Sequence, residues 1–207
     1  MCTRRVSQTS RHDLLALLVG TVLLCSIGTF EDAQAQRQRQ GFWLEAGFGG
    51  GWNLIRGLDA GSTPNAGGYF RLGGTPSGRL LAGVEVLGWA RAVRVPPALG
   101  NYVFSAFNLS GVVLFYPLRS WPVYVKGGLG ATTVDISVDA KVEFQVRSRQ
   151  NGIGATFGAG IETPAVGSFL ITFSADWAGQ TFGRQGRNLR RNDQNAFLVL
   201  AAGIRWQ

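Results

Sequence analysis

Large apolar residues alternate with small or polar residues along eight separate segments of this chain. The first such segment covers residues 42–52 and shows the pattern best. One of its faces carries Phe42, Leu44, Ala46, Phe48 and Trp52, and the other carries Glu45, Gly47, Gly49 and Gly51. Side chains of a β-strand point alternately to opposite faces, so a period of two predicts a strand with two different surroundings.

Four later segments repeat the alternation. They cover residues 123–132, 153–162, 169–177 and 198–206, each with bulky apolar residues on one face and mainly glycine, alanine, serine or threonine on the other. Segments 68–74, 80–91 and 103–116 are less regular but compatible with strands, so the pattern defines their two faces less clearly.

The connections between the predicted strands alternate in length. Residues 75–78, 117–122 and 163–168 form short connections rich in turn residues, whereas 53–67, 92–102, 135–151 and 179–196 are longer and polar. Short turns at one end and long loops at the other are typical of bacterial outer-membrane barrels. We therefore predict an all-β fold, an eight-stranded antiparallel up-and-down transmembrane β-barrel with four extracellular loops.

Alternation alone does not decide which face of such a barrel points outward. A soluble lipocalin-like barrel would hold its apolar side chains inside, around a ligand. The interior of eight strands is only just wide enough for side chains, and eight rows of phenylalanine, tryptophan, leucine and isoleucine would overfill it. The bulky face is therefore predicted to meet lipid, with the small and charged residues inside.

The start of the chain has the features of a secretory signal. Basic residues precede the apolar run 14–25, and the small-residue site Ala33-Gln-Ala35 follows it, the order that signal peptidase recognises. We predict a cleaved signal peptide at residues 1–35 and a barrel domain at 36–207. An uncleaved membrane anchor is the alternative, and lipidation of Cys25 is disfavoured by the large Leu24 before it.

Composition then narrows the chemistry. Both cysteines and the single histidine lie in the predicted signal peptide: Cys2, Cys25 and His12. The mature chain would have no disulfide, no thiol nucleophile and no imidazole, which removes the usual parts of serine hydrolases and zinc sites. We predict no catalytic residue, no cofactor and no metal, and hence a protein that is not an enzyme.

Seven charged residues fall on the predicted inner face: Glu45, Arg71, Glu85, Lys126, Glu162, Asp176 and Arg205. A lone charge in a narrow apolar space is costly, so pairing is expected. The strand positions suggest three pairs, Glu45 with Arg205, Lys126 with Glu162, and Arg71 with Glu85, leaving Asp176 without an obvious partner. Such a network is either an ion path or a polar core that keeps the barrel shut, and the narrow interior favours the core.

The last long loop is strongly basic, with Arg184, Arg187, Arg190 and Arg191, and Lys141, Arg147 and Arg149 add charge to the preceding long loop. Arginine suits phosphate, so the last loop is a candidate site for the phosphates of lipopolysaccharide. A solvated loop without a ligand explains the same charges. The pI of about 10.5 would also suit nucleic acid, but no nucleic-acid-binding fold is visible.

Two neighbouring phrases, Leu114-Phe-Tyr-Pro-Leu118 and Pro122-Val-Tyr-Val-Lys-Gly-Gly-Leu-Gly130, resemble the small outer-membrane β-barrel proteins related to the transmembrane domain of OmpA. The resemblance covers residues 36–207 and implies outer-membrane lipid and the outer-membrane assembly machinery as partners. The family usually ends on an aromatic residue, whereas here Gln207 follows Trp206. The peptidoglycan-binding domain is not part of the resemblance, so cell-wall anchoring is not implied.

The sequence thus predicts an exported, non-enzymatic protein of the bacterial outer membrane with an envelope-structural or surface-interaction role through its long loops. Two alternatives stay open: a narrow pore for ions or small solutes, and a soluble lipocalin-like binding barrel. The loop ligand and the oligomeric state are not predicted.

Overall fold

The structure is a computed structural model, and it describes residues 41–54, 65–94, 101–118, 121–139, 147–182 and 194–207. The predicted signal peptide with Cys25 lies outside the described residues. So do Lys141 and the four arginines of the last loop.

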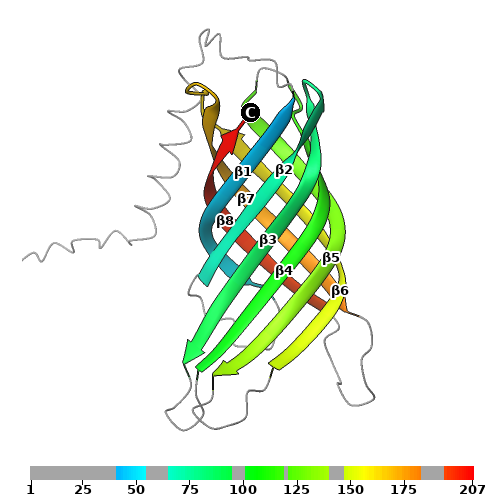
Figure 1. The fold of residues 1–207 in the computed structure, drawn as a ribbon, viewed down its shortest axis with the longest axis vertical. Coiled ribbons are helices and arrows are strands. Elements are labelled where there is room, and N and C mark those ends of the chain that lie inside the picture. The colour runs from blue at the N-terminus through cyan, green and yellow to red at the C-terminus, as the bar shows by residue number, and fades with distance from the viewer. Residues whose placement is uncertain (1–40, 55–64, 95–100, 119–120, 140–146, 183–193) are drawn as a thin grey trace, which may run out of the picture. The chain divides into compact units, whose positions relative to one another are not determined.

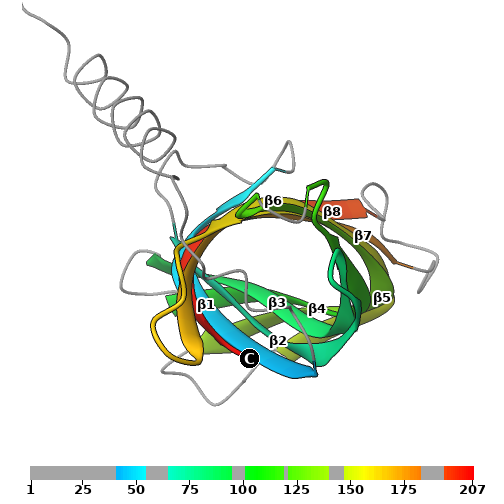
Figure 2. The ribbon, with the colours of Figure 1, turned by 90° about the horizontal axis from the view of Figure 1, so that it is seen from above.

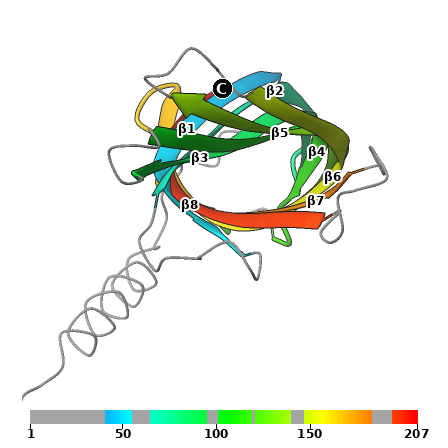
Figure 3. The ribbon, with the colours of Figure 1, turned by 90° about the horizontal axis from the view of Figure 1, so that it is seen from below.

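The described chain forms eight β-strands. They are β1 (Phe42–Asn53), β2 (Asn65–Ser77), β3 (Leu80–Arg94), β4 (Asn101–Phe115), β5 (Val123–Asp139), β6 (Arg147–Glu162), β7 (Phe169–Phe182) and β8 (Gln194–Trp206). Each strand pairs antiparallel with its neighbours in the sequence, and β1 pairs with β8 to close the sheet. Figures 1, 2 and 3 show the closed ring from the side and from its two ends. The predicted eight-stranded, up-and-down antiparallel barrel is confirmed.

The two ends of the barrel differ. The short β2–β3, β4–β5 and β6–β7 connections lie at the end that also holds the C-terminus, uppermost in Figure 1. The strands at the other end extend further than the sequence predicted: β5 continues to Asp139 and β6 begins at Arg147, inside the segment 135–151 that was expected to be loop. On β5 the alternation continues as Val134-Asp-Ile-Ser-Val138, but the apolar residues now share the inward row of the buried Val134. The paired end of β6, residues 147–151, is polar throughout.

The bulky apolar side chains point outward. Phe48, Leu129 and Ile153 are 71%, 70% and 73% exposed on the outer surface. The faces predicted for β1, β5, β6, β7 and β8 are confirmed by the burial pattern. Among the residues that the structure describes, there is no helix long and apolar enough to cross a membrane.

The inner face differs from the prediction in one respect. It also holds large side chains, most of them from the three segments with the less regular alternation. Buried among them are Trp43, Tyr69, Leu81, Leu87, Trp89, Leu114 and Tyr116. They can be accommodated because glycines on nearby strands leave room: a Cβ at Gly47 on β1 would overlap the ring of Tyr69 on β2, and one at Gly51 on β1 the ring of Trp89 on β3.

The close approach of β5 to β4 depends on a glycine at one inward position. A Cβ at Gly130 would overlap the carbonyl oxygen of Leu109 on β4, whereas a Cβ at Gly127, which points outward, would meet nothing within 4 Å. We expect Gly130→Ala to destabilise the barrel by about 1–3 kcal/mol, as overpacking does, and Gly127→Ala to change its stability little. Urea unfolding of the two variants in the same detergent tests this, and equal midpoints would contradict it.

Candidate functional site

Four charged residues form one row across the inner wall of four neighbouring strands. Arg205 on β8 lies opposite Glu45 on β1, Glu45 lies opposite Arg71 on β2, and Arg71 lies opposite Glu85 on β3. All four side chains are fully buried. The charges alternate along the row, so each internal member has an opposite charge on both sides.

Short contacts join the members of this row. The Arg205 Nη2 and Nε atoms lie 2.6 and 2.9 Å from Glu45 Oε2. Arg71 donates from Nη1 to Glu45 Oε1 at 3.3 Å and from Nε to Glu85 Oε2 at 2.5 Å. Both arginines are therefore held by more than one bond, the arrangement in which buried ion pairs best offset their desolvation.

A second group reaches the row from the opposite wall. Lys126 on β5 and Asp176 on β7 flank Gly158 on β6, and their Nζ and Oδ1 atoms meet at 2.7 Å. A Cβ at Gly158 would overlap Asp176 Oδ1, so glycine is what lets the two side chains meet there. Asp176 Oδ2 accepts from Arg71 Nη2 at 2.6 Å, and Lys126 contacts Glu85, so the network crosses the lumen.

Glu162 extends the network towards the short turns. It pairs with Arg205 and accepts a hydrogen bond from the hydroxyl of Tyr116, which itself accepts from Arg205 Nη1 at 2.5 Å. Glu45 Oε1 also accepts hydrogen bonds from two hydroxyl groups, from Tyr69 at 2.7 Å and from Thr172 at 2.8 Å.

The sequence analysis did not identify the hydroxyl-bearing residues of the network, which are Tyr69, Tyr116, Thr172 and Ser174. Ser174 donates to Asp176 at 2.7 Å, and the Arg71 guanidinium lies 3.6 Å from the centre of the Tyr69 ring. The available signal was position, because Thr172 and Ser174 fall in the same alternating row of segment 169–177 as Asp176.

Two of the three expected pairs are present, because the structure brings Glu45 to Arg205 and Arg71 to Glu85. The expected pair of Lys126 with Glu162 is corrected. The register sets Lys126 opposite Gly158 rather than near Glu162, and its ion pairs go to Glu85 and Asp176. Asp176, expected to lack a partner, contacts two cations.

Apolar layers lie on both sides of the charges. Towards the short turns there is a cluster of Trp43, Leu81, Val112, Leu114, Tyr116 and Tyr124. Towards the long loops there is a larger cluster of Tyr69, Leu87, Trp89, Ala106, Val134, Ala178, Phe182, Phe197, Val199 and Ala201. The interior is therefore a layered core of packed side chains with the ionic network in its middle.

The acidic side chains of this network are engaged by basic ones. Each carboxylate of the network contacts a cationic side chain, and Glu85 and Asp176 are bridged by Arg71 and Lys126. Within the described ranges no three histidine, cysteine or acidic side chains are grouped so as to hold a metal ion. The ion pairs link the inner faces of opposite strands across the lumen.

Comparisons with known proteins agree with this fold. No protein-family model and no curated protein matches the chain. Ail, the attachment invasion locus protein of Yersinia pestis, solved in complex with the heparin analogue sucrose octasulfate, is 15% identical over 81% of this chain and 99% of its own, with a TM-score of 0.54. A second Ail structure gives 14% identity, the same coverage and a TM-score of 0.51.

Neisserial surface protein A is 16% identical over 80% of this chain and 96% of its own, also with a TM-score of 0.54. The chain therefore has the fold of the small eight-stranded outer-membrane β-barrels. At this identity the likeness concerns the fold.

The observed ion pairs predict which residues are energetically coupled. In a double-mutant cycle, Lys126→Met with Asp176→Asn should show a coupling of about 1 kcal/mol or more, because the two side chains touch. The matched cycle of Lys126→Met with Glu162→Gln should show a smaller coupling, because these two side chains are linked only through other members of the network. Urea unfolding in detergent measures both, and the reverse ranking would refute the assignment of partners.

Proposed function

We propose that this chain is a non-enzymatic protein of the bacterial outer membrane that presents its long loops at the cell surface. The observation that carries the proposal is the belt of large apolar side chains exposed around a closed barrel. Soluble proteins rarely expose a continuous apolar surface of this extent. A closed barrel is also the only sheet that leaves no unpaired strand edge in hydrocarbon.

The height of the belt supports the same proposal. On β6 the outward residues from Ile161 to Ile153 are apolar or small, and Asn151 and then Arg149 follow. On β7 the outward series from Phe169 gives way to Thr181. Each series spans about ten residues, the length with which a tilted strand crosses a bilayer.

The interior argues against the two alternatives. A lipocalin-like binder needs an apolar cavity and a polar exterior, whereas here the exterior is apolar and the interior holds ion pairs. A pore needs a continuous lumen, whereas two apolar clusters and a cross-lumen ionic network fill this one. We infer that recognition, where it occurs, belongs to the surface and the loops.

Export and membrane assembly give the first test. We expect the protein in the outer-membrane fraction, migrating faster on a gel when unheated than when boiled, because folded barrels resist cold detergent. Its intact mass should correspond to a chain that begins at Gln36, after loss of residues 1–35. Recovery from the soluble periplasm, without a heat-dependent shift, would contradict the proposal.

The basic loop gives the second test. The neighbour Ail was solved with a polysulfated ligand, and here Arg184, Arg187, Arg190 and Arg191 crowd the loop between β7 and β8. We propose that these arginines bind the phosphates of lipopolysaccharide. Replacing all four by glutamine should weaken binding of lipopolysaccharide to the purified barrel about tenfold or more, with the wild-type affinity falling as salt rises.

The control for this experiment is Arg79→Gln, which removes an exposed arginine from the β2–β3 turn at the opposite end of the barrel. It should leave binding unchanged. Equal binding by the four-fold variant and the wild type would mean that the loop is merely solvated.

A further inference from the structure

One row of inward-facing residues winds completely around the inner wall. The row of four charged residues on β8, β1, β2 and β3 continues across the next five strand pairings, each residue opposite the next, through Ser110, Gly130, Gly154, Gln180 and Asn195. Because the strands of a closed barrel are staggered, the row leaves β8 at Arg205 and returns to it at Asn195, ten residues nearer the long loops. Every position of this row is charged, polar or glycine.

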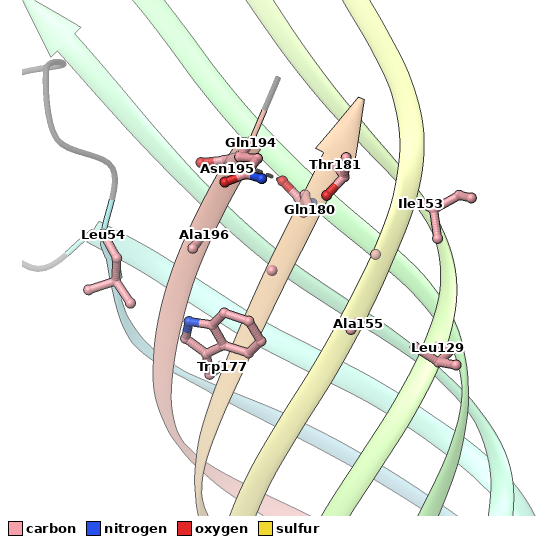
Figure 4. A pocket seen from close by; sticks show the side chains of 12 residues that line it. Leu54, Leu129, Ile153, Ala155, Trp177, Gln180, Thr181, Gln194, Asn195 and Ala196 are labelled. Atoms are coloured by element: carbon pink, nitrogen blue, oxygen red, sulfur yellow. Dashed lines mark hydrogen bonds between the residues drawn. The ribbon is translucent and has the colours of Figure 1, made fainter. Parts of the chain in front are cut away.

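Uncharged polar side chains fill the part of the row nearer the long loops. Asn195 Nδ2 on β8 donates to Gln180 Oε1 on β7 at 2.7 Å, and the two side chains lie side by side in Figure 4. Gln180 Nε2 donates in turn to Thr132 Oγ1 on β5. Asn108, opposite Thr132 on β4, donates from Nδ2 to Ser110 Oγ at 2.6 Å. All five side chains are buried, so these polar groups lie inside the barrel.

Glycine lines the inner wall next to these side chains. The inward positions of β5 and β6 there include Gly128, Gly130 and Gly154, and Thr156 follows Gly154 on the same face. A Cβ at Gly154 would overlap Asn108 Oδ1, and a Cβ at Gly128 would overlap Thr156 Oγ1. Asn108 Oδ1 and Thr156 Oγ1 therefore border the same glycine-lined part of the wall.

Three buried oxygen atoms around this part of the wall have no hydrogen-bond partner among the residues that the structure describes. They are Asn108 Oδ1, Thr156 Oγ1 and Glu85 Oε1, and all three side chains are 0% exposed. Glu85 belongs to the group because it lies opposite Ser110, the residue to which Asn108 donates. Buried polar atoms in folded proteins are almost always bonded to protein or to ordered water.

A suitable partner is a small, neutral hydrogen-bond donor. Amide and carboxylate oxygens only accept hydrogen bonds, so two of the three atoms require a donor. A metal cation is disfavoured, because Arg71 and Lys126 already contact the Glu85 carboxylate and would repel it. A water molecule carries no charge, donates two hydrogen bonds and typically bridges about three buried polar groups.

We propose that this barrel binds ordered water on its inner wall, over Gly130 and Gly154. The water donates to the free oxygens of Asn108, Thr156 and Glu85. It joins the ionic network to the hydrogen-bonded side chains nearer the long loops, so that the row from Arg205 to Asn195 becomes one continuous polar network. The inference concerns the interior and goes beyond the proposed surface role.

The experiment removes one hydroxyl and reads the sign of the change in stability. Thr156→Val keeps the shape of the side chain, so with water bound it removes hydrogen bonds, and we expect a lower midpoint of urea unfolding in detergent. Without bound water it removes an unpartnered buried hydroxyl, which should raise the midpoint. Thr181→Val is the matched control, because it makes the same substitution at an exposed outward position of β7. A midpoint for Thr156→Val equal to or above that of the control would overturn the proposal.

A second measurement detects the water itself. Magnetic relaxation dispersion of the water nuclei counts the molecules that stay bound long enough to tumble with the barrel. We expect fewer of them in Thr156→Val than in the wild type, whereas Thr156→Ser, which keeps the hydroxyl, should retain them. A wild-type barrel that holds no long-lived water would overturn the proposal, even where Thr156→Val fails to fold.

A bound metal ion would give a different result. With water in the site, the urea midpoint of the wild type should be the same in sodium, potassium and choline chloride at equal ionic strength. A midpoint that depends on the cation would show that an ion occupies the site and would overturn the assignment of water.

Discussion

Closure of the sheet is the constraint on which the rest of this structure depends. Pairing of β1 with β8 leaves each described strand with a neighbour on both sides. In hydrocarbon an unpaired backbone group costs several kcal/mol, so a sheet that exposes its apolar face to lipid has to close. Closing with only eight strands makes the interior narrow, and the narrow interior determines which side chains the inner face can hold.

The inner face meets this constraint by combining glycine with long charged and aromatic side chains. Arg71 can reach Asp176 across the lumen, and Lys126 can meet Asp176 over Gly158, because glycine leaves the space between them. Removing one member would leave a buried charge without its partner, which is far more costly than the net gain from forming the pair. The ionic network and the apolar clusters on either side of it occupy the middle of the barrel.

The outward residues of the barrel differ in size along the wall. Most outward positions carry large apolar residues, but Ala155, Gly179 and Ala196 form a recess just below the polar rim.

The sequence by itself determined the strand count, the inward position of all seven charges and two of the ion pairs. It could do so because the alternation of side chains is a local property of an extended backbone, and because closure must bring Glu45 next to Arg205. Only the tertiary structure decided the partners of Lys126 and Asp176. Those partners depend on the register between β5, β6 and β7 and on contacts across the lumen. No repeating pattern in the sequence reports either of them. The inward rings of Tyr69 and Tyr124 likewise depend on the glycines opposite them, Gly47 and Gly160, because space at one position is set by the residue on another strand.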